Sequence, residues 1–187
     1  MQKIGFALAS GTLLGLALTI AACQPADTSV TDNSAVAPAQ LPPEAVAYAQ
    51  LTAADGTRHG RAVFTDTAAG VEVEISFTGL PANVHAVHVH ETGACTPPDY
   101  TSSGGHWNPA GVPHPQHKGD LGNVGPNSDG TASLSAVIEG VSLFGGNLPM
   151  LDADGAALIV HAMADDMVSQ PSGAAGPRLA CGVVTAG

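Results

Sequence analysis

The chain has 187 residues, enough for one domain with a tail, and 44% of them are hydrophobic, enough for a buried core. Sixteen acidic residues against five lysines and arginines give a formal net charge of −11 at pH 7. This acidity argues against nucleic acid or an anionic lipid surface as a charge-recognised partner. Aromatic residues are only 4%, whereas 23 glycines and 14 prolines favour short strands and turns over helices.

The N-terminus has the pattern of a secretory signal peptide at residues 1–22. Lys3 supplies a positive charge, residues 4–20 form an apolar run, and two alanines precede Cys23. The run is too short and wrongly flanked for a stable membrane span. The sequence around Cys23 also resembles a bacterial lipobox, in which the cysteine becomes a lipidated N-terminus. The alternative is a plain signal peptide that contains a cysteine by chance.

Residues 23–44 are expected to form a lipidated, flexible tether, because polar residues, Pro and Ala dominate and no apolar periodicity is present. Residues 1–22 contain one charged residue, Lys3, so their removal changes the formal net charge from −11 to −12. A protein this acidic would be attached to a membrane by its lipid and not by positive charge. We therefore expect a periplasmic or cell-surface protein. Gln24 after the cysteine, in place of Asp, favours the outer membrane if the organism is Gram-negative.

Residues 45–187 are predicted to form one β domain. Residues 71–77 alternate apolar and polar side chains, as a half-buried strand does. Short strands between glycine-rich turns predict an antiparallel sandwich or barrel. Two long stretches, residues 91–120 and 162–177, interrupt this pattern, and loops of this length are usually functional. The other segments of strand type are residues 46–51, 59–64, 84–90, 132–138, 157–160 and 181–184.

Six of the eight histidines lie between residues 85 and 117, and this concentration predicts a metal site. His88 and His90 are two apart, so in a strand both leave the same face and can converge on one ion. Surface histidines in an acidic protein are the alternative. A denser group has the three imidazoles and one carboxylate of a tetrahedral zinc site. Its members are His106, His114, His117 and Asp120.

Several motifs together resemble the copper–zinc superoxide dismutases, over nearly all of residues 45–187. The resemblance implies an all-β, eight-stranded antiparallel Greek-key barrel or sandwich with two long functional loops. The segment CTPPDY at residues 95–100 resembles the bacterial branch of the family. The other motifs are HAVHVH at 85–90, GGHWNP at 104–109, HKGDLGN at 117–123, VHAMADD at 160–166 and GPRLACG at 176–182.

The resemblance also implies the cofactors, copper and zinc. His106 would bridge the two ions and act in catalysis by delivering a proton. The remaining copper ligands would be His88, His90 and His161. The remaining zinc ligands would be His114, His117 and Asp120. Only two residues separate His114 from His117, a shorter gap than is usual in the family, so the geometry at zinc should be tighter.

Three further roles follow from the resemblance. Asp165 would link a copper ligand to a zinc ligand, Arg178 would attract the anionic substrate, and Cys95 would pair with Cys181 in the family's disulfide. Arg178 and Lys118 are the loop cations available to draw superoxide to this acidic protein. Because residues 162–177 contain no lysine, weaker steering is expected than in relatives that have lysines there.

The implied activity is dismutation of superoxide to dioxygen and hydrogen peroxide outside the cytoplasm, with a redox-cycling copper and a structural zinc. The main alternative is a protein that stores or delivers metal without turnover. Such a protein would need the histidines, but not Asp165, Arg178 and the bridging His106 together. The sequence leaves open whether the protein forms a homodimer.

Overall fold

The computed structural model describes residues 45–187, so the predicted signal peptide and tether at 1–44 lie outside the described residues. No helix of this described region is long and apolar enough to cross a membrane. The region forms β1 (Val46–Thr52), β2 (Arg58–Thr67), β3 (Gly70–Phe77), β4 (His85–His90), β5 (Asp120–Val124), β6 (Ala132–Glu139), β7 (Ala157–His161), β8 (Arg178–Val183), β9 (Thr185–Ala186) and a short 3-10 helix, η1 (Thr101–Ser103).

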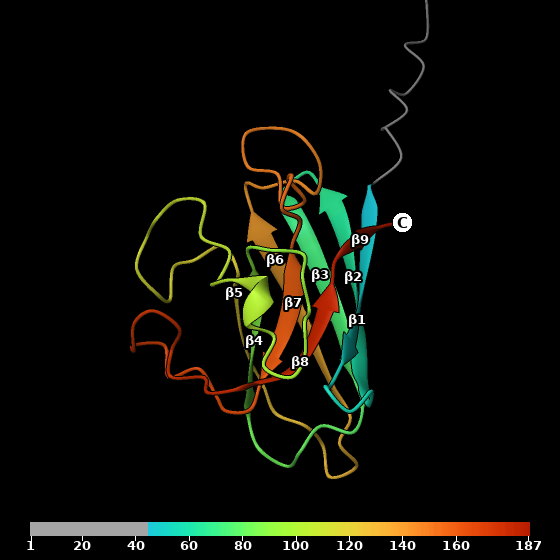
Figure 1. Cartoon of the computed structure of the whole chain (residues 1–187). Coiled ribbons are helices and arrows are strands. Elements are labelled where there is room, and N and C mark those ends of the chain that lie inside the picture. Colours follow the sequence, from blue (N-terminus) through green and yellow to red (C-terminus); the bar gives the residue numbers. More distant parts are fainter. Residues whose placement is uncertain (1–44) are drawn as a thin grey trace, which may run out of the picture. The chain divides into compact units, whose positions relative to one another are not determined.

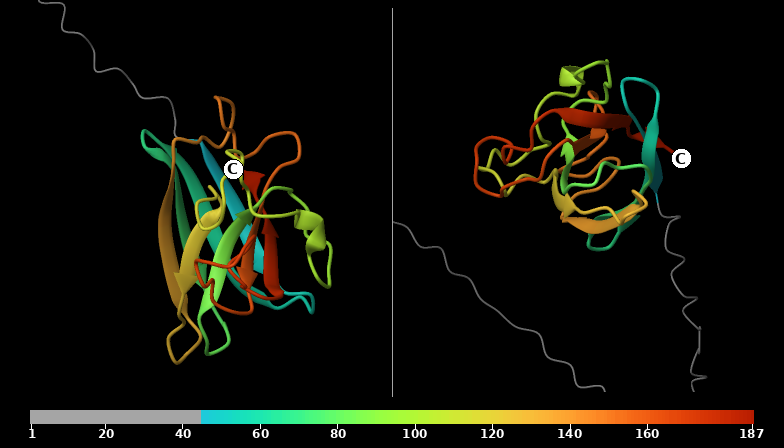
Figure 2. Two further views of the ribbon diagram at one scale, coloured as in Figure 1. Left: turned by 90° about the vertical axis from the view of Figure 1, so that its left-hand side faces the viewer. Right: turned by 90° about the horizontal axis from the view of Figure 1, so that it is seen from below.

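The strands form one antiparallel sheet in the order β5-β4-β7-β8-β1-β2-β3-β6, and the short β9 pairs with β1. The end strands of this path, β5 and β6, come close together, so the sheet rolls into a nearly closed barrel (Figure 1, Figure 2). In the sheet β3 is followed by β6, and β4 by β7, which are the crossovers of a Greek key. The predicted fold is therefore confirmed.

The barrel interior is filled from alternate positions of the strands. On β3 the side chains of Val73, Ile75 and Phe77 point inward and are at most 2% exposed. They pack with Leu51 and Phe64 in one apolar cluster, where each buried side chain of this kind contributes about 1.5–3 kcal/mol. The alternation predicted over residues 71–77 thus reflects one face in the core and one toward solvent.

Two segments differ from the sequence-based expectation. Strand β5, with the sequence DLGNV, was not predicted because it lacks alternation and contains glycine. Its pairing with β4 makes it a strand and sets Asp120 opposite His88. The connection at residues 140–156 is also long, but it inserts Leu143 and Met150, both fully buried, into the barrel core. That loop therefore serves packing.

The outer faces of β4 and β7 are covered by two loops, called here the first loop (residues 91–119) and the second loop (residues 162–177). Every residue of β4 and β7 is buried, although only one face of each strand points into the barrel. Tyr100 of the first loop packs on Ala157 and Ile159, on the outer face of β7. The loops thus create a second buried layer outside the barrel, and the histidines proposed as metal ligands lie in it.

Candidate metal centre

Four buried imidazoles converge between the barrel and the two loops. His88 and His90 extend from β4, His161 ends β7, and His106 belongs to the first loop. One ring nitrogen from each lies within 4.8 Å of the others. The four residues, called here the four-histidine cluster, are between 0% and 7% exposed. The two strands therefore bring together three residues that lie up to 73 positions apart.

The converging nitrogens are unpaired. Nδ1 of His88 and Nε2 of His90, His106 and His161 are buried and have no hydrogen-bond partner among residues 45–187. A buried polar atom without a hydrogen-bond partner lowers the stability of the fold by about 1–3 kcal/mol. Four such nitrogens at one point therefore indicate a site for a ligand that accepts their lone pairs. Imidazole nitrogens of this kind bind copper well, so the donor set fits a copper ion.

The opposite ring nitrogens are all occupied, which fixes each ring. His90 Nδ1 donates to Gly104 O at 3.0 Å, and His161 Nδ1 donates to Gly176 O at 3.2 Å. His88 Nε2 donates to Asp165 Oδ2 at 2.9 Å. Such outer bonds set the tautomer, so the free nitrogen of each ring carries the lone pair.

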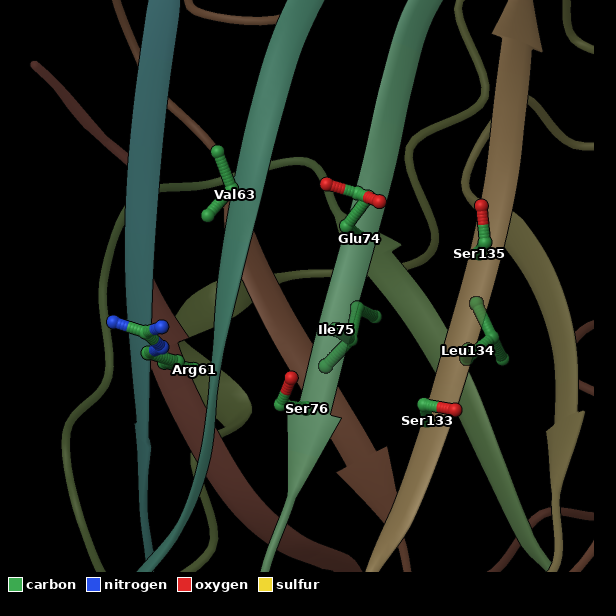
Figure 3. A pocket seen from close by; sticks show the side chains of 8 residues that line it. All are labelled: Arg61, Val63, Glu74, Ile75, Ser76, Ser133, Leu134 and Ser135. Carbon is green, nitrogen blue, oxygen red and sulfur yellow. The ribbon is translucent and has the colours of Figure 1, made fainter.

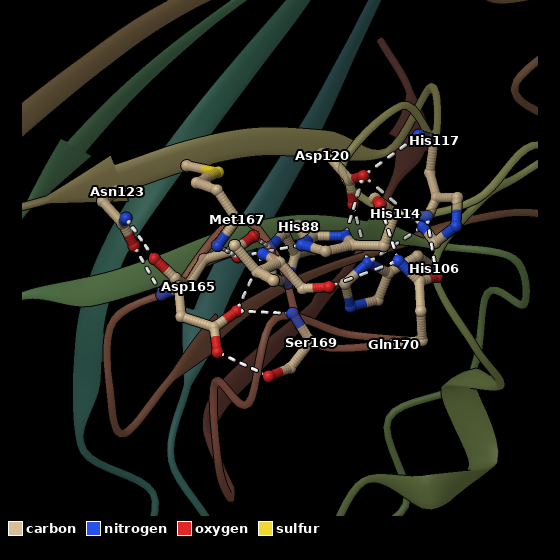
Figure 4. Close-up of polar contacts among 12 residues, drawn as sticks. His88, His106, His114, His117, Asp120, Asn123, Asp165, Met167, Ser169 and Gln170 are labelled. Atoms are coloured by element: carbon tan, nitrogen blue, oxygen red, sulfur yellow. Dashed lines mark hydrogen bonds and ion pairs between the residues drawn. The ribbon is translucent and has the colours of Figure 1, made fainter.

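A second cluster, called here the histidine–aspartate cluster, consists of His106, His114, His117 and Asp120 (Figure 4). Its ligand atoms also lie within 4.8 Å of one another. The carboxylate of Asp120 is 2.7 Å from His106 Nδ1, 3.1 Å from His114 Nδ1 and 3.4 Å from His117 Nδ1. His114 Nδ1 still lacks a hydrogen bond, because the ring donates its proton from Nε2 to Asp165 and Nδ1 carries a lone pair. Three imidazoles and one carboxylate fit a tetrahedral zinc ion, and the short gap between His114 and His117 does not prevent convergence.

His106 belongs to both clusters. Its Nε2 faces the four-histidine cluster, and its Nδ1 faces Asp120. The centre of its ring lies 3.9 Å from that of His88 and 5.4 Å from that of His117. One imidazole thus offers a nitrogen to each cluster, the arrangement that a bridge between two ions requires.

Asp165 joins the clusters from the second loop. Its Oδ2 accepts from His88 Nε2 and its Oδ1 from His114 Nε2, both at 2.9 Å, and its side chain is fully buried. Asn123 of β5 holds the backbone of Asp165 through two hydrogen bonds (Figure 4). Asn123 was not singled out from the sequence as a site residue, although it ends the HKGDLGN motif.

Electrostatics keep these groups in the forms that bind metal. Burial, with added repulsion from neighbouring imidazoles, lowers the pKa of His88 to about 3, of His90 to about 2 and of His161 to about 4. Burial alone would raise the pKa of Asp120, but its hydrogen bond with His106 and the nearby imidazoles lower it. At neutral pH the three rings are neutral and the carboxyl is ionised, so metal need displace no proton from them.

A cavity of about 460 Å³ opens onto the four-histidine cluster and is lined by His90, His106, His161 and Arg178. Arg178 lies opposite His161 in the β7–β8 pairing. Its guanidinium donates to Tyr100 O, Ser103 Oγ and Gly104 O at 2.6–2.8 Å, so it is held in place by the first loop.

Lys118 is not part of this cavity. Its Nζ donates to Glu139 O, at the end of β6, at 2.8 Å. Arg178 is therefore the one cation that lines the cavity among the described residues.

Cys95 and Cys181 form the predicted disulfide, with their Cα atoms 5.7 Å apart. The bond attaches the first loop to β8 across 86 positions of sequence. In the chain-entropy model, a disulfide that closes a loop of this size stabilises the fold by about 4–5 kcal/mol, because it restricts the unfolded chain. It also holds the segment whose carbonyl groups fix Arg178.

His85 is close to the clusters but is not a ligand. Its Nδ1 lies 2.7 Å from His161 O and its Nε2 3.1 Å from Pro81 O, so both ring nitrogens have partners. Neither ring nitrogen is therefore free for a metal ion. The isolated His59 belongs to neither cluster.

Another hollow, of about 310 Å³, lies on the outer faces of β2, β3 and β6 (Figure 3). Its lining includes Arg61, Glu74 and Ser133, and none of the residues that the sequence singles out for metal or catalysis. The chemistry predicted from the sequence is therefore confined to the loop-covered side of the barrel.

Comparison with known proteins agrees with this geometry. The family model for copper/zinc superoxide dismutase matches residues 58–184. A Cu-Zn superoxide dismutase of Caulobacter vibrioides is 39% identical over 147 residues, which are 74% of this chain and 84% of that protein. Cu-Zn superoxide dismutase 2 of Aquifex aeolicus is 37% identical, over 74% of this chain and 85% of its own. A crystal structure of a SOD-like protein from Bacillus subtilis matches with a TM-score of 0.68 and 35% identity, over 72% of this chain and 95% of that one.

Proposed function

The chain belongs to the copper/zinc superoxide dismutase family, and we propose that it converts superoxide into dioxygen and hydrogen peroxide at its two histidine clusters. The observation that carries the proposal is the set of four unpaired, buried ring nitrogens beneath a cavity that Arg178 lines. When bound, copper would supply the one-electron oxidation and reduction of superoxide, and His106 would help to hold the zinc ion through its other ring nitrogen.

The ligand sets follow from the free nitrogens. Copper would be held by His88 Nδ1 and by Nε2 of His90, His106 and His161. Zinc would be held by His106, His114, His117 and Asp120. Overall, two superoxide ions and two protons give one dioxygen and one hydrogen peroxide: one superoxide loses an electron, and the other gains that electron and both protons.

His106 is the residue suited to handle one of these protons. Its Nε2 is buried at the floor of the cavity and has no partner among the described residues, while its Nδ1 stays with Asp120. His106 could take up a proton at Nε2 only while this nitrogen is not holding copper. The proton would then face the cavity and could be given to the substrate.

Arg178 provides the attraction for the anion. Its guanidinium lines the cavity with His90 and His161, and three hydrogen bonds from the first loop fix its position. A fixed positive charge in a partly enclosed site acts more strongly than one in open water. This local field must oppose the net negative charge of the protein, which repels superoxide at long range.

The test is superoxide dismutation by the purified protein, with copper and zinc content measured on the same sample. The expected result is one copper and one zinc per chain with rapid dismutation. Tightly bound copper without dismutation would instead support storage or delivery of metal.

We also propose that the protein acts outside the cytoplasm, attached to a membrane through lipid on Cys23. The support is the lipobox-like sequence and the Cys95–Cys181 disulfide, since such bonds persist mainly in oxidising compartments. Cells fed radioactive palmitate should label the parent and not the Cys23→Ser variant. Equal labelling would exclude this anchor. Sedimentation of the purified protein would decide whether it is a homodimer.

A further inference from the structure

Gln170 of the second loop makes an unusual contact with His114. Its Oε1 accepts from the backbone N–H of His114 at 3.0 Å, and its Nε2 donates to the backbone carbonyl of His114 at 2.7 Å (Figure 4). One side-chain amide thus satisfies both peptide groups of a residue 56 positions away. Sequence reasoning did not single out Gln170.

His114 depends on this contact because its own surroundings offer little backbone support. Pro113 and Pro115 flank it, and proline has no N–H to donate. By contrast, His117 is tied directly to the cluster, since its N–H donates to Asp120 Oδ2 at 3.0 Å.

The second loop is built so that Gln170 reaches His114. The carboxylate of Asp166 accepts from the N–H groups of Val168 and Ser169 and from the Ser169 hydroxyl. Ser169 O in turn accepts from Gly173 N at 2.7 Å. The bonds to Asp166 close a compact turn immediately before Gln170, and the bond from Gly173 to Ser169 closes a second turn that contains Gln170. Asp166, next to Asp165 in sequence, therefore shapes the loop rather than the metal site.

A close approach at Gly173 completes the arrangement. A Cβ atom there would lie 1.8 Å from Asp165 Oδ1 and 2.8 Å from His114 Nε2. Only glycine lets the loop lie against this hydrogen bond. The second loop thus holds His114 at its backbone through Gln170 and at its ring through Asp165.

We propose that Gln170 is a positioning residue for zinc, whose carboxamide holds His114 in place and compensates for the short His114–His117 segment. The inference rests on the proposed function, since it concerns the same metal centre. It predicts a selective effect, because His88, His90 and His161 of the four-histidine cluster lie on strands, whereas the side-chain hydrogen bonds of Gln170 go to His114 and Val168.

The test compares the metal-loaded parent with two variants. Gln170→Met keeps the length of the side chain and removes both hydrogen bonds, and Gln170→Glu keeps the acceptor for His114 N–H but loses the donor. The control is Gln116→Met, which changes an exposed glutamine inside the short segment itself. Zinc affinity is measured by competition with a chelator, and retained copper is measured in the same samples.

Gln170→Met should bind zinc about tenfold more weakly than the parent, the size of effect that follows loss of a group holding a metal ligand. Gln170→Glu should lie between them, Gln116→Met should match the parent, and copper should be retained throughout. Equal zinc affinity in Gln170→Met and the parent would overturn the inference, as would parallel loss of copper and zinc, which marks a merely structural role. If the parent itself binds no zinc, the proposed function fails instead.

Discussion

The two clusters share His106 but are built differently. The four-histidine cluster takes three of its members from β4 and β7, adjacent strands of the barrel. In the histidine–aspartate cluster only Asp120 lies in a strand, at the first residue of β5. The sheet therefore orders the first cluster, whereas contacts between the loops order the second. Copper binding should accordingly tolerate loop changes that zinc binding does not.

The largest expected effect comes from removing a ligand on the sheet. His90→Ala should lower copper affinity and the rate of dismutation by more than about 100-fold. Even the loss of a residue that only hydrogen-bonds to a metal ligand lowers metal affinity by about 10–100-fold, and His90 is itself a proposed ligand. Zinc should remain bound, since His90 is not in the histidine–aspartate cluster. Metal analysis and a dismutation assay measure both, with His59→Gln as the control histidine. Loss of zinc together with copper would show that the clusters do not form independently.

Asp165→Asn tests the connection between the clusters. The carboxylate accepts from one ring of each cluster, His88 and His114, whereas an amide has only one oxygen and turns its NH₂ toward the other ring. Zinc affinity should fall by about 10–100-fold, and copper affinity by less, because His88 stays on β4. Competition with a chelator measures both affinities. If copper affinity fell more than zinc affinity, the copper ligands would not be ordered by the sheet independently of the loops.

The sequence predicts the strand-borne part of this site better than the loop-borne part. Periodicity alone places His88 and His90 on one face of a strand, and the family motifs supply His106 and Asp165. Strand β5 was not predicted, because the sequence DLGNV has no strand pattern of its own. Its pairing with β4 makes it extended. The contact of Gln170 with His114 was not predicted either, because no local rule relates residues 56 positions apart.

The pH dependence of the metal-free protein should report the burial of the four-histidine cluster. The pKa values of His88, His90 and His161 in the folded protein are about 2 to about 4, below the ordinary value of 6.5. Between the folded and the ordinary pKa values, the unfolded chain therefore binds more protons than the folded protein does. Stability is then complete above pH 6.5 and is lost as the pH falls. The free energy of unfolding should drop by about 2 kcal/mol from pH 7 to pH 6. Denaturant titrations at the two pH values measure it, and His161→Ala should reduce the drop by about a third. No change over this range would mean that the rings are not buried as neutral groups.

Arg178→Ala should slow dismutation by about tenfold at low ionic strength, because it removes the cation that lines the cavity. Added salt should narrow the difference from the parent, since screening weakens attraction. Arg61→Ala is the matched control: it removes the same charge from the hollow on the far side of the barrel (Figure 3). If both variants lose activity equally, net charge and not the placement of Arg178 attracts the anion.

Glu91→Gln should have the smallest effect and the opposite sign. Glu91 also lines the cavity, and its Oε1 accepts from Gly105 N at 3.0 Å. Glutamine keeps an oxygen for that bond, so the first loop should hold its place while the negative charge disappears. A unit charge about 10 Å away in water is worth about 0.4 kcal/mol, which corresponds to a gain of about twofold in rate. Stopped-flow measurement against ionic strength checks it: the gain should vanish at high salt, because it comes from reduced repulsion of superoxide. A gain that persists at high salt, or a loss of copper, would mean that Glu91 acts by shaping the first loop beside Gly104, whose carbonyl holds both His90 and Arg178.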